Sequence, residues 1–281
     1  MKKRVISGVV IAIVLIAVWT QIFNPIFDIF FGILAAAACY EITKAVGLKN
    51  KEMQAVAIIF SGVLAVGVIY ASKFPISLLC IIYVIFLVIM TVIHNSEVTF
   101  EQVAATVYAS FIIPIAFSFA GLIADLYKAY DFIDKRECVF FIWFAIAGSL
   151  FTDVFAQLTG MAFGKHKMTP VLSPKKTWEG SIGGVLCALI LNILWLFIFI
   201  KFFADKPFAI PVWFYILMSP IISVISMFGD LMASFIKRNY GIKDYSNLIP
   251  GHGGIMDRFD SVILVMPAFY VMMSIYGLVV S

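Results

Sequence analysis

Nine long apolar runs, separated by short polar segments, constrain this chain more than any other feature. They occupy residues 5–23, 25–41, 53–72, 75–94, 102–126, 139–162, 180–204, 208–236 and 259–280. A helix needs about 20 mostly apolar residues to cross the hydrocarbon core of a bilayer. Closed barrels would show short alternating segments instead. The runs therefore predict an all-α fold, a polytopic transmembrane helical bundle of about nine spans.

The composition excludes an ordinary soluble fold of this length. Of the 281 residues, 63% are hydrophobic and only 13% are charged, whereas soluble domains are about a quarter charged. The net charge of +4 gives no reason to expect a nucleic-acid partner. Because neither repeats nor low-complexity linkers interrupt the chain, we predict a single membrane-embedded domain over residues 1–281.

The first run, residues 5–23, follows the basic start Met1-Lys2-Lys3-Arg4 and resembles a signal peptide. It is too long for a signal-peptide core, and no small-residue cleavage site ends it, so we expect a retained first span. Only Asn24 and Pro25 separate it from the second run. The two runs therefore form a tight hairpin or two half-spans, and a total of eight or ten spans stays open.

Lysine and arginine in the loops predict the orientation of the spans. With the N-terminus inside, the inside regions carry 14 of the 20 basic residues and the outside regions carry 6. The loop 127–137 disagrees, because it places three basic residues outside. The overall bias still favours a cytoplasmic N-terminus and, with nine spans, a C-terminus on the other side.

Two polar loops, residues 164–180 and 238–257, are rich in Lys, Gly, Pro, Asp and Ser. Two spans separate them, so they share one face of the membrane whichever way the chain is oriented. Functional residues of a membrane protein concentrate in such loops. These loops and the adjoining span ends are therefore the expected location of a functional site.

Two aspartates lie within apolar runs, Asp153 and Asp230. A charged side chain in the hydrocarbon costs at least about 2.5 kcal/mol, so it normally faces a partner or a polar cavity. Gln157 lies one helical turn after Asp153, and the pair predicts a polar stripe that points inward. A hydrogen bond or salt bridge between helices without any catalytic role is the alternative interpretation.

Asp257 and Asp260 begin the last apolar run and share one helix face, three residues apart. Helix capping explains one such aspartate, but it explains two aspartates plus a buried Asp230 poorly. Magnesium binds one or two protein carboxylates and leaves its other positions to water and phosphate oxygens. The three carboxylates therefore predict a Mg²⁺ site made of Asp230, Asp257 and Asp260.

Three glycines lie just before these aspartates, in Gly251-His252-Gly253-Gly254. Glycines let backbone N–H groups approach an anion closely, although such a cluster is more often a flexible turn. Four cations surround it in the sequence: Lys237, Arg238, Lys243 and Arg258. Cations and glycines beside carboxylates favour a site for a metal-bound polyphosphate.

In the earlier loop, Ser173 and Pro174 fit a helix N-cap followed by proline in the first turn. Lys175, Lys176 and Thr177 would then lie in that first turn, where phosphate binds readily. The ordinary excess of lysine in cytoplasmic loops is the alternative interpretation of the same residues.

Several familiar motifs are absent from the sequence. It contains no GxxxxGK[ST], no HExxH and no GxSxG, and its four cysteines lack zinc-binding spacing. A transporter with intramembrane carboxylates would show paired repeats and broken helices. The spaced DG…AR…G…D…D pattern of CDP-alcohol phosphotransferases is also missing. Both alternatives are therefore disfavoured.

The segment 234–260 resembles the signature of the phosphatidate cytidylyltransferase (CDP-diacylglycerol synthase) family. It reads S-F-I-K-R, four residues, K-D-Y-S, two residues, and I-P-G-H-G-G-I-M-D-R-F-D. The loop S-P-K-K-T-W-E-G, residues 173–180, is similar to the second motif of that family. The diagnostic motifs thus lie in 153–180 and 229–260, within one catalytic domain.

The resemblance implies a metal-dependent nucleotidyltransferase of phospholipid biosynthesis, a homodimer that converts CTP and phosphatidic acid into CDP-diacylglycerol and pyrophosphate. It implies Mg²⁺, with a second cation such as K⁺ nearby, held by residues that match Asp230, Asp257 and Asp260. We expect Lys237 and Arg238 to be catalytic. The expected substrate-binding residues are Lys175, Lys176, Ser173, Thr177, Lys243, His252, Gly253, Gly254, Arg258, Asp153 and Gln157. We expect a multi-pass protein of the bacterial inner membrane, with its active site facing the cytoplasm.

Overall fold

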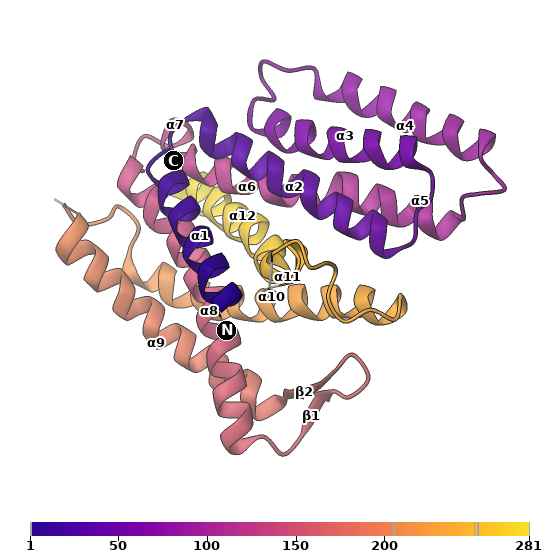
Figure 1. Ribbon diagram of the computed structural model, residues 1–281. Helices are drawn as coiled ribbons and strands as arrows, with labels where there is room; N and C mark the ends of the chain where they lie inside the picture. Colours follow the sequence, from indigo (N-terminus) through magenta and orange to yellow (C-terminus); the bar gives the residue numbers. More distant parts are fainter. Residues whose placement is uncertain (1, 205, 250, 252, 281) are drawn as a thin grey trace. The chain divides into compact units, whose positions relative to one another are not determined.

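The computed structural model describes residues 2–204, 206–249, 251 and 253–280, and over these residues the chain is mainly helical (Figure 1). The helices are α1 (Lys2–Trp19), α2 (Pro25–Ala45), α3 (Lys51–Ile69), α4 (Ile76–Ile93), α5 (Phe100–Val107), η1 (Tyr108–Ile112), α6 (Ile113–Ala124), α7 (Leu126–Ala129), α8 (Lys135–Phe163), α9 (Trp178–Phe203), α10 (Val212–Asn239), α11 (Met256–Phe259) and α12 (Val262–Val280). The strands are β1 (Lys167–Thr169) and β2 (Ser173–Thr177), paired as an antiparallel hairpin. The predicted all-α class is confirmed.

Eight helical segments of the described chain are long and apolar enough to cross a membrane. They are α2, α3, α4, the continuous segment 100–124, α8, α9, α10 and α12. The predicted first span forms α1, which is not among the eight because three of its 18 residues are cationic. The prediction of a polytopic bundle of about nine spans is therefore confirmed.

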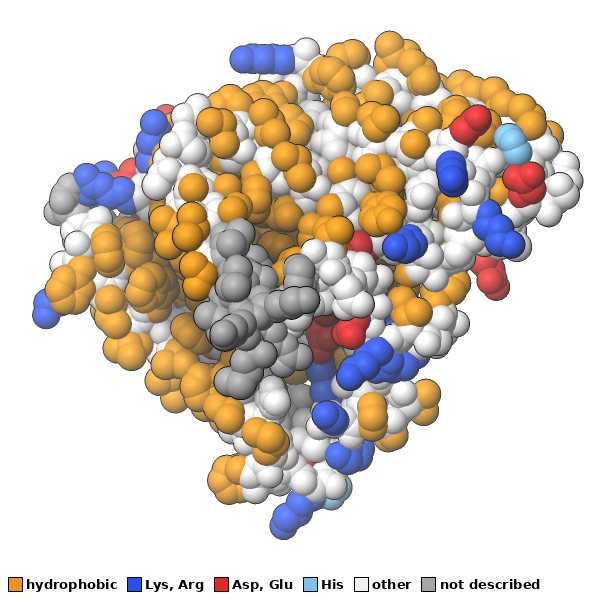
Figure 2. Space-filling view, in the orientation of Figure 1, with side chains coloured by type: hydrophobic (Ala, Val, Ile, Leu, Met, Phe, Trp, Pro, Cys, Tyr) orange, Lys and Arg blue, Asp and Glu red, His pale blue; other side chains and the backbone are white. Residues whose placement is uncertain are grey.

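Apolar side chains on the outside of the molecule agree with a lipid-facing surface. Figure 2 shows hydrophobic side chains over much of the visible face. On α4, Leu78, Ile81, Val88 and Val92 are each more than half exposed. An apolar helix face that is not covered by protein is stable in lipid but not in water, which supports a multi-pass membrane protein.

The chain divides into two compact units that interleave along the sequence. The first unit contains Met1–Gly121 and Asn239–Phe259, and the second contains Leu122–Arg238 and Asp260–Ser281. The signature segment 234–260 is therefore shared between the two units. The prediction of one catalytic domain concerns function and stays a prediction.

In the first unit, α2 packs along α3, and both contact η1. Gly32 of α2 lies so close to α3 that an added Cβ would come 3.0 Å from the carbonyl oxygen of Gly62. Small residues at this contact let the two backbones approach closely. The short helix α11 also contacts α2, and this contact brings the segment 239–259 onto that helix.

In the second unit, α8 packs along α9 and also contacts α12. Buried hydroxyl pairs join α8 to α10: Ser149 to Ser226 and Thr152 to Ser223, both at 2.8 Å between oxygen atoms. Hydrogen bonds between helices replace contacts with water that lipid cannot supply. They fix the register of α8 against α10, and hence the positions of the aspartates on these two helices.

Thr177 is the N-cap of α9, and its hydroxyl accepts a hydrogen bond from the Gly180 N–H at 3.1 Å. The prediction that Ser173 and Pro174 begin this helix is wrong, because residues 173–177 pair with β1 and the helix begins at Trp178. A threonine that caps the helix satisfies a terminal N–H. Both lysines, 175 and 176, thus lie on a strand before the helix.

Candidate active site

Three carboxylates gather in the second unit, from α8, from α10 and from the segment before α12. They belong to Asp153, Asp230 and Asp260. The Ser261 hydroxyl donates a hydrogen bond to Asp153 Oδ2 at 3.0 Å, and the Ser261 N–H donates one to Asp260 Oδ1 at 2.8 Å. Ser261 is 5% exposed, so this buried serine links two of the three aspartates.

The backbone of α10 approaches the segment before α12 closely at Gly229. A Cβ at Gly229 would lie 2.6 Å from the Asp260 carbonyl oxygen and 3.0 Å from the Ser261 Cα. No side chain larger than hydrogen fits at that distance without a shift. Gly229 therefore lets α10 bring Asp230 beside Asp260.

Two lysines accompany the carboxylates. Lys176 of β2 forms an ion pair with Asp230, with 2.5 Å between Nζ and Oδ2, and both side chains are mostly buried. Lys237 of α10 is only 9% exposed. Burial raises the pKa of Asp260 to about 7; the negative charge of Asp230 adds to this shift and the positive charge of Lys237 opposes it. The cluster thus concentrates negative charge that a cation can stabilise.

The chemistry of the donors fits one hard cation. Within the described residues, no group of three His, Cys, Asp or Glu side chains is arranged to hold a metal. Magnesium needs only one or two protein carboxylates when phosphate oxygens and water supply the rest. Asp230 and Asp260 meet that requirement, while the metal itself stays a prediction.

The two neighbouring lysines of β2 have different surroundings. Lys175 is exposed, whereas Lys176 points to Asp230. Successive side chains of a strand point to opposite faces, which accounts for the difference. Ser173 is half-buried at the start of the strand. Of the two predicted phosphate ligands, Lys176 alone belongs to the carboxylate cluster.

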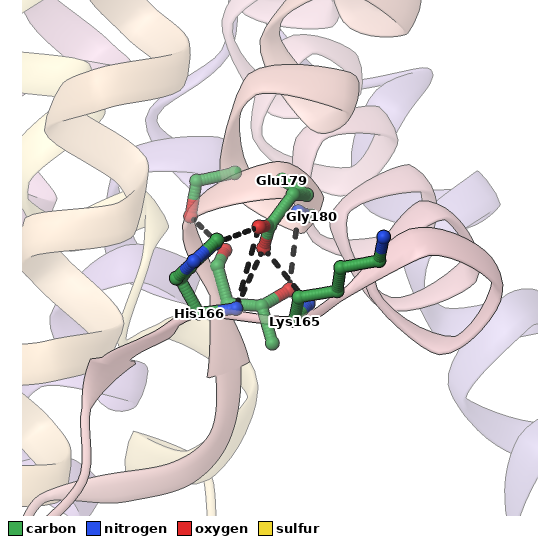
Figure 3. A network of polar contacts seen from close by, with 6 residues as sticks. Lys165, His166, Glu179 and Gly180 are labelled. Carbon is green, nitrogen blue, oxygen red and sulfur yellow. Dashed lines mark hydrogen bonds and ion pairs between the residues drawn. The ribbon is translucent and has the colours of Figure 1, made fainter.

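The carboxylate of Glu179, which was not among the predicted site residues, lies at the base of the β1–β2 hairpin (Figure 3). Glu179 accepts hydrogen bonds from the N–H groups of Lys165 and His166, at 3.1 and 3.2 Å. Its Oε1 also lies 2.5 Å from His166 Nδ1. Figure 2 shows basic side chains gathered at the bottom of the view, where Figure 1 places β1 and β2. Glu179 thereby holds a cation-rich hairpin beside Asp230.

In the first unit, the glycine-rich part of the signature folds back on itself. Gly251 and Gly253 have φ of 80° and 84°, a left-handed conformation that suits glycine. Asp257 Oδ2 accepts hydrogen bonds from the N–H groups of Tyr245 and Gly254, at 2.9 and 3.1 Å. The predicted turn that binds an anion through its N–H groups thus holds the carboxylate of Asp257.

A second carboxylate on this loop comes from far away in the sequence. Glu41 of α2 accepts hydrogen bonds from the N–H groups of Ile255 and Met256, at 2.9 and 2.8 Å. Glu41 lies near the C-terminal end of α2, close to Thr43 and Lys44, so the local sequence reads as the polar end of a span and does not mark it. Only the contact of α11 with α2 could have revealed it.

The other predicted residues fall into three groups. Asp153 is half-buried in the cluster, but Gln157 is exposed, so the predicted inward stripe is present only at Asp153. Lys243 and Arg258 are exposed in the first unit, and Arg238 is exposed at the end of α10. His252 lies outside the described residues. The structure thus gathers five predicted residues in the second unit: Asp153, Lys176, Asp230, Lys237 and Asp260.

Comparison with known proteins extends over the whole chain. The model of the cytidylyltransferase family matches residues 2–276. A protein of Bacillus subtilis (strain 168) named phosphatidate cytidylyltransferase is 30% identical over 285 residues, which cover 99% of each chain. Proteins of the same name from Staphylococcus haemolyticus and Staphylococcus aureus (strain COL) are each 40% identical. These two alignments span about half of each chain, 53% and 51% of the relatives' own length.

Proposed function

Because this chain belongs to the cytidylyltransferase family, we propose that it is a phosphatidate cytidylyltransferase. It transfers CMP from CTP to phosphatidic acid and releases CDP-diacylglycerol and pyrophosphate. The observation that carries the proposal is the arrangement of Asp230, Asp260 and Lys176 in a multi-pass membrane protein. The full-length similarity to a relative named for this reaction supports the same substrates.

The reaction is an in-line nucleotidyl transfer. A phosphate oxygen of phosphatidic acid attacks the α-phosphorus of CTP, the bond from that phosphorus to the bridging oxygen breaks, and pyrophosphate leaves with the bonding electrons. The attacking oxygen is already anionic at neutral pH, so no general base is required. The protein's part is to position two anions and to neutralise their charge.

The basic residues supply much of that neutralisation. Lys176 and Lys237 lie within the carboxylate cluster, where they hold phosphate oxygens of the substrates. Lys175 and Arg238 are exposed in the second unit, where they meet the nucleotide from solvent, while the contacts of Lys243 and Arg258 with phosphate stay predictions from the sequence. Charge-assisted hydrogen bonds to phosphate are about twice as strong as neutral ones, which favours these side chains as ligands.

Asp230 and Asp260 are the residues that would hold Mg²⁺, while the role of Asp257 as a metal ligand stays a prediction from the sequence. When bound, the cation supplies a positive charge that polarises the phosphates and stabilises the transition state. Mg²⁺ at Asp230 would take the place of the Lys176 ammonium, which forms an ion pair with that carboxylate, and Lys176 would then be available to bind phosphate. We also propose that a second cation such as K⁺ binds nearby.

Each substrate can stay in its own solvent if the site lies at the membrane surface. CTP arrives from water, and phosphatidic acid keeps its acyl chains in lipid. We place the site at the cytoplasmic face of the bacterial inner membrane, as the excess of basic residues in the loops favours. We also propose that the protein acts as a homodimer.

Incorporation of radiolabelled CTP into lipid tests the reaction. The purified protein, supplied with phosphatidic acid, should form labelled CDP-diacylglycerol. EDTA should stop this reaction, and added Mg²⁺ should restore it. Phosphatidylcholine in place of phosphatidic acid is the control for lipid specificity. The absence of labelled lipid with phosphatidic acid, Mg²⁺ and K⁺ present would overturn the proposal.

Single-cysteine labelling tests the orientation. A cysteine introduced at Lys175 or at Lys243 in a cysteine-free background should react with a membrane-impermeant maleimide only after the cells are opened. Both positions are exposed in the structure, so the reagent can reach them. Labelling of both positions in intact cells would place these loops outside and refute the assignment.

A further inference from the structure

Glu41 is a fully buried carboxylate whose hydrogen-bond donors all come from the signature segment. It is 0% exposed. Its oxygens accept from the Ser246 hydroxyl at 2.5 Å and from the N–H groups of Ile255 and Met256 at 2.9 and 2.8 Å. The acceptor and the donors are more than 200 positions apart in the sequence.

A buried carboxylate is stable only where donors or a cation compensate for the lost water. Three hydrogen bonds from one loop therefore provide the compensation. If the loop moved away, all three hydrogen bonds to Glu41 would be lost and its buried carboxylate would be left without donors. The contact therefore favours one conformation of the loop.

The loop is shaped for this contact at Gly254. A Cβ there would lie 2.6 Å from Glu41 Oε2, closer than real side chains approach. Gly254 does not have a positive φ, in contrast to Gly253. The conformation of Gly254 thus permits an alanine, but the added Cβ would have to displace the Glu41 carboxylate.

The same loop carries Asp257, whose Oδ2 binds the N–H groups of Tyr245 and Gly254. Resting on the proposed function, we infer that Glu41 is a positioning residue for the cytidylyl transfer. Through its hydrogen bonds, Glu41 holds the loop that contains Ser246, Ile255 and Met256, here called the signature loop, against α2. This contact fixes the backbone that orients Asp257. The oxygens of Glu41 are occupied by the loop, so it acts through the loop and not on the substrate.

Hydrogen exchange of the full-length protein, in detergent without substrates, tests this contact independently of activity. In Glu41→Ala, the amides of Ile255 and Met256 should exchange about tenfold faster or more, because local opening loses its main opposing contact. The matched control is Asp28→Asn, another buried carboxylate of α2, which accepts from the Tyr70 hydroxyl instead of the loop. That control should leave the two amides unchanged. Unchanged exchange in Glu41→Ala, or equal acceleration in both variants, would overturn the inference.

Kinetics separates positioning from general stability. Glu41→Gln keeps one oxygen acceptor but turns an amide toward a donor, so kcat should fall by about tenfold and less than in Glu41→Ala. Asp28→Asn should keep kcat within about twofold even where it lowers the melting temperature. If the wild-type protein makes no CDP-diacylglycerol, the proposed function fails while the exchange experiment still decides the role of Glu41.

A double-mutant cycle tests the contact itself. Gly254→Ala should accelerate exchange of the loop amides in the wild-type background, because its Cβ meets the Glu41 carboxylate. In the Glu41→Ala background the same change should add little, since the obstacle is gone. Additive effects of the two substitutions would show that Glu41 and Gly254 do not act through this contact.

Discussion

Carboxylates of the first and second units have different partners. In the first unit, Glu41 and Asp257 accept hydrogen bonds from backbone N–H groups of the signature loop. In the second unit, Asp153 and Asp260 share a serine, and Asp230 pairs with a lysine. Backbone donors are fixed by the fold, whereas a lysine side chain can exchange its place with another cation.

The carboxylates of the first unit therefore have a structural role, and those of the second unit are suited to a chemical one. A carboxylate bound to backbone N–H groups organises a loop and gains little from a further cation. Carboxylates that face one another repel, and binding a cation relieves that repulsion. Burial raises the pKa of Asp260, and the negative charge of Asp230 in the same unit adds to this shift. The comparison predicts the largest catalytic losses there.

Removal of charge in the second unit should have the largest effect. Asp230→Asn and Asp260→Asn should each lower kcat by about a thousandfold or more, because metal binding supplies several kcal/mol and about 1.4 kcal/mol corresponds to tenfold. Asp260→Asn should change folding little, since a neutral amide is easier to bury than a carboxylate, whereas Asp230→Asn should lower the melting temperature because it leaves Lys176 without its ion-pair partner. Radiolabelled CTP incorporation and a thermal unfolding curve measure the two effects. Near wild-type turnover in a folded variant would remove that aspartate from the mechanism.

The neighbouring lysines of β2 form a matched pair. Lys176→Ala should lower kcat/KM by about 10- to 100-fold, because one charge-assisted contact contributes about 1.5–3 kcal/mol. Lys175→Ala should change it only a few-fold, through the KM for CTP, because Lys175 is exposed. Steady-state kinetics with each substrate varied distinguishes the two. Equal losses would mean that the inward position of Lys176 is irrelevant.

Asp257 tests this comparison. Its hydrogen bonds to backbone N–H groups resemble those of Glu41, whereas the resemblance of the signature segment to the family implies that it binds metal. Asp257→Asn keeps an oxygen for the amides of Tyr245 and Gly254 but removes the charge. We expect about a tenfold or larger loss of kcat if the charge contributes 1.4 kcal/mol or more. Magnesium titration of the variant provides the check, since a lost ligand raises the Mg²⁺ concentration needed. A well-folded variant with wild-type rate and metal dependence would make Asp257 purely structural.

The overall fold could be read from the sequence because the bilayer leaves few choices. Apolar runs of the right length become helices, and eight of the nine predicted runs form helices that qualify as spans. The strand at 173–177 could not be predicted in the same way. Ser173-Pro174 fits a helix start by composition, and only the pairing with β1 and the cap at Thr177 exclude it.

The candidate site was predictable where the chemistry is carried by unusual residues. Buried aspartates in apolar helices, such as Asp230, stand out in any membrane sequence. Glu41 and Ser261 did not stand out, because their roles depend on contacts between distant segments. The division of the signature between two units likewise has no local signal in the sequence.

The smallest catalytic effect should come from Thr177, which shapes the hairpin without joining the cluster. Thr177→Val keeps the size and β-branching of the side chain but removes the oxygen that accepts from the Gly180 N–H. Loss of an N-cap costs about 1 kcal/mol, so the melting temperature should fall while kcat changes by less than about threefold. Thr177→Ser keeps the cap oxygen and should restore the stability. A large loss of kcat in Thr177→Ser but not in Thr177→Val would instead give the Thr177 methyl group a part in placing Lys176, and the boundary between structural and chemical residues would then extend into β2.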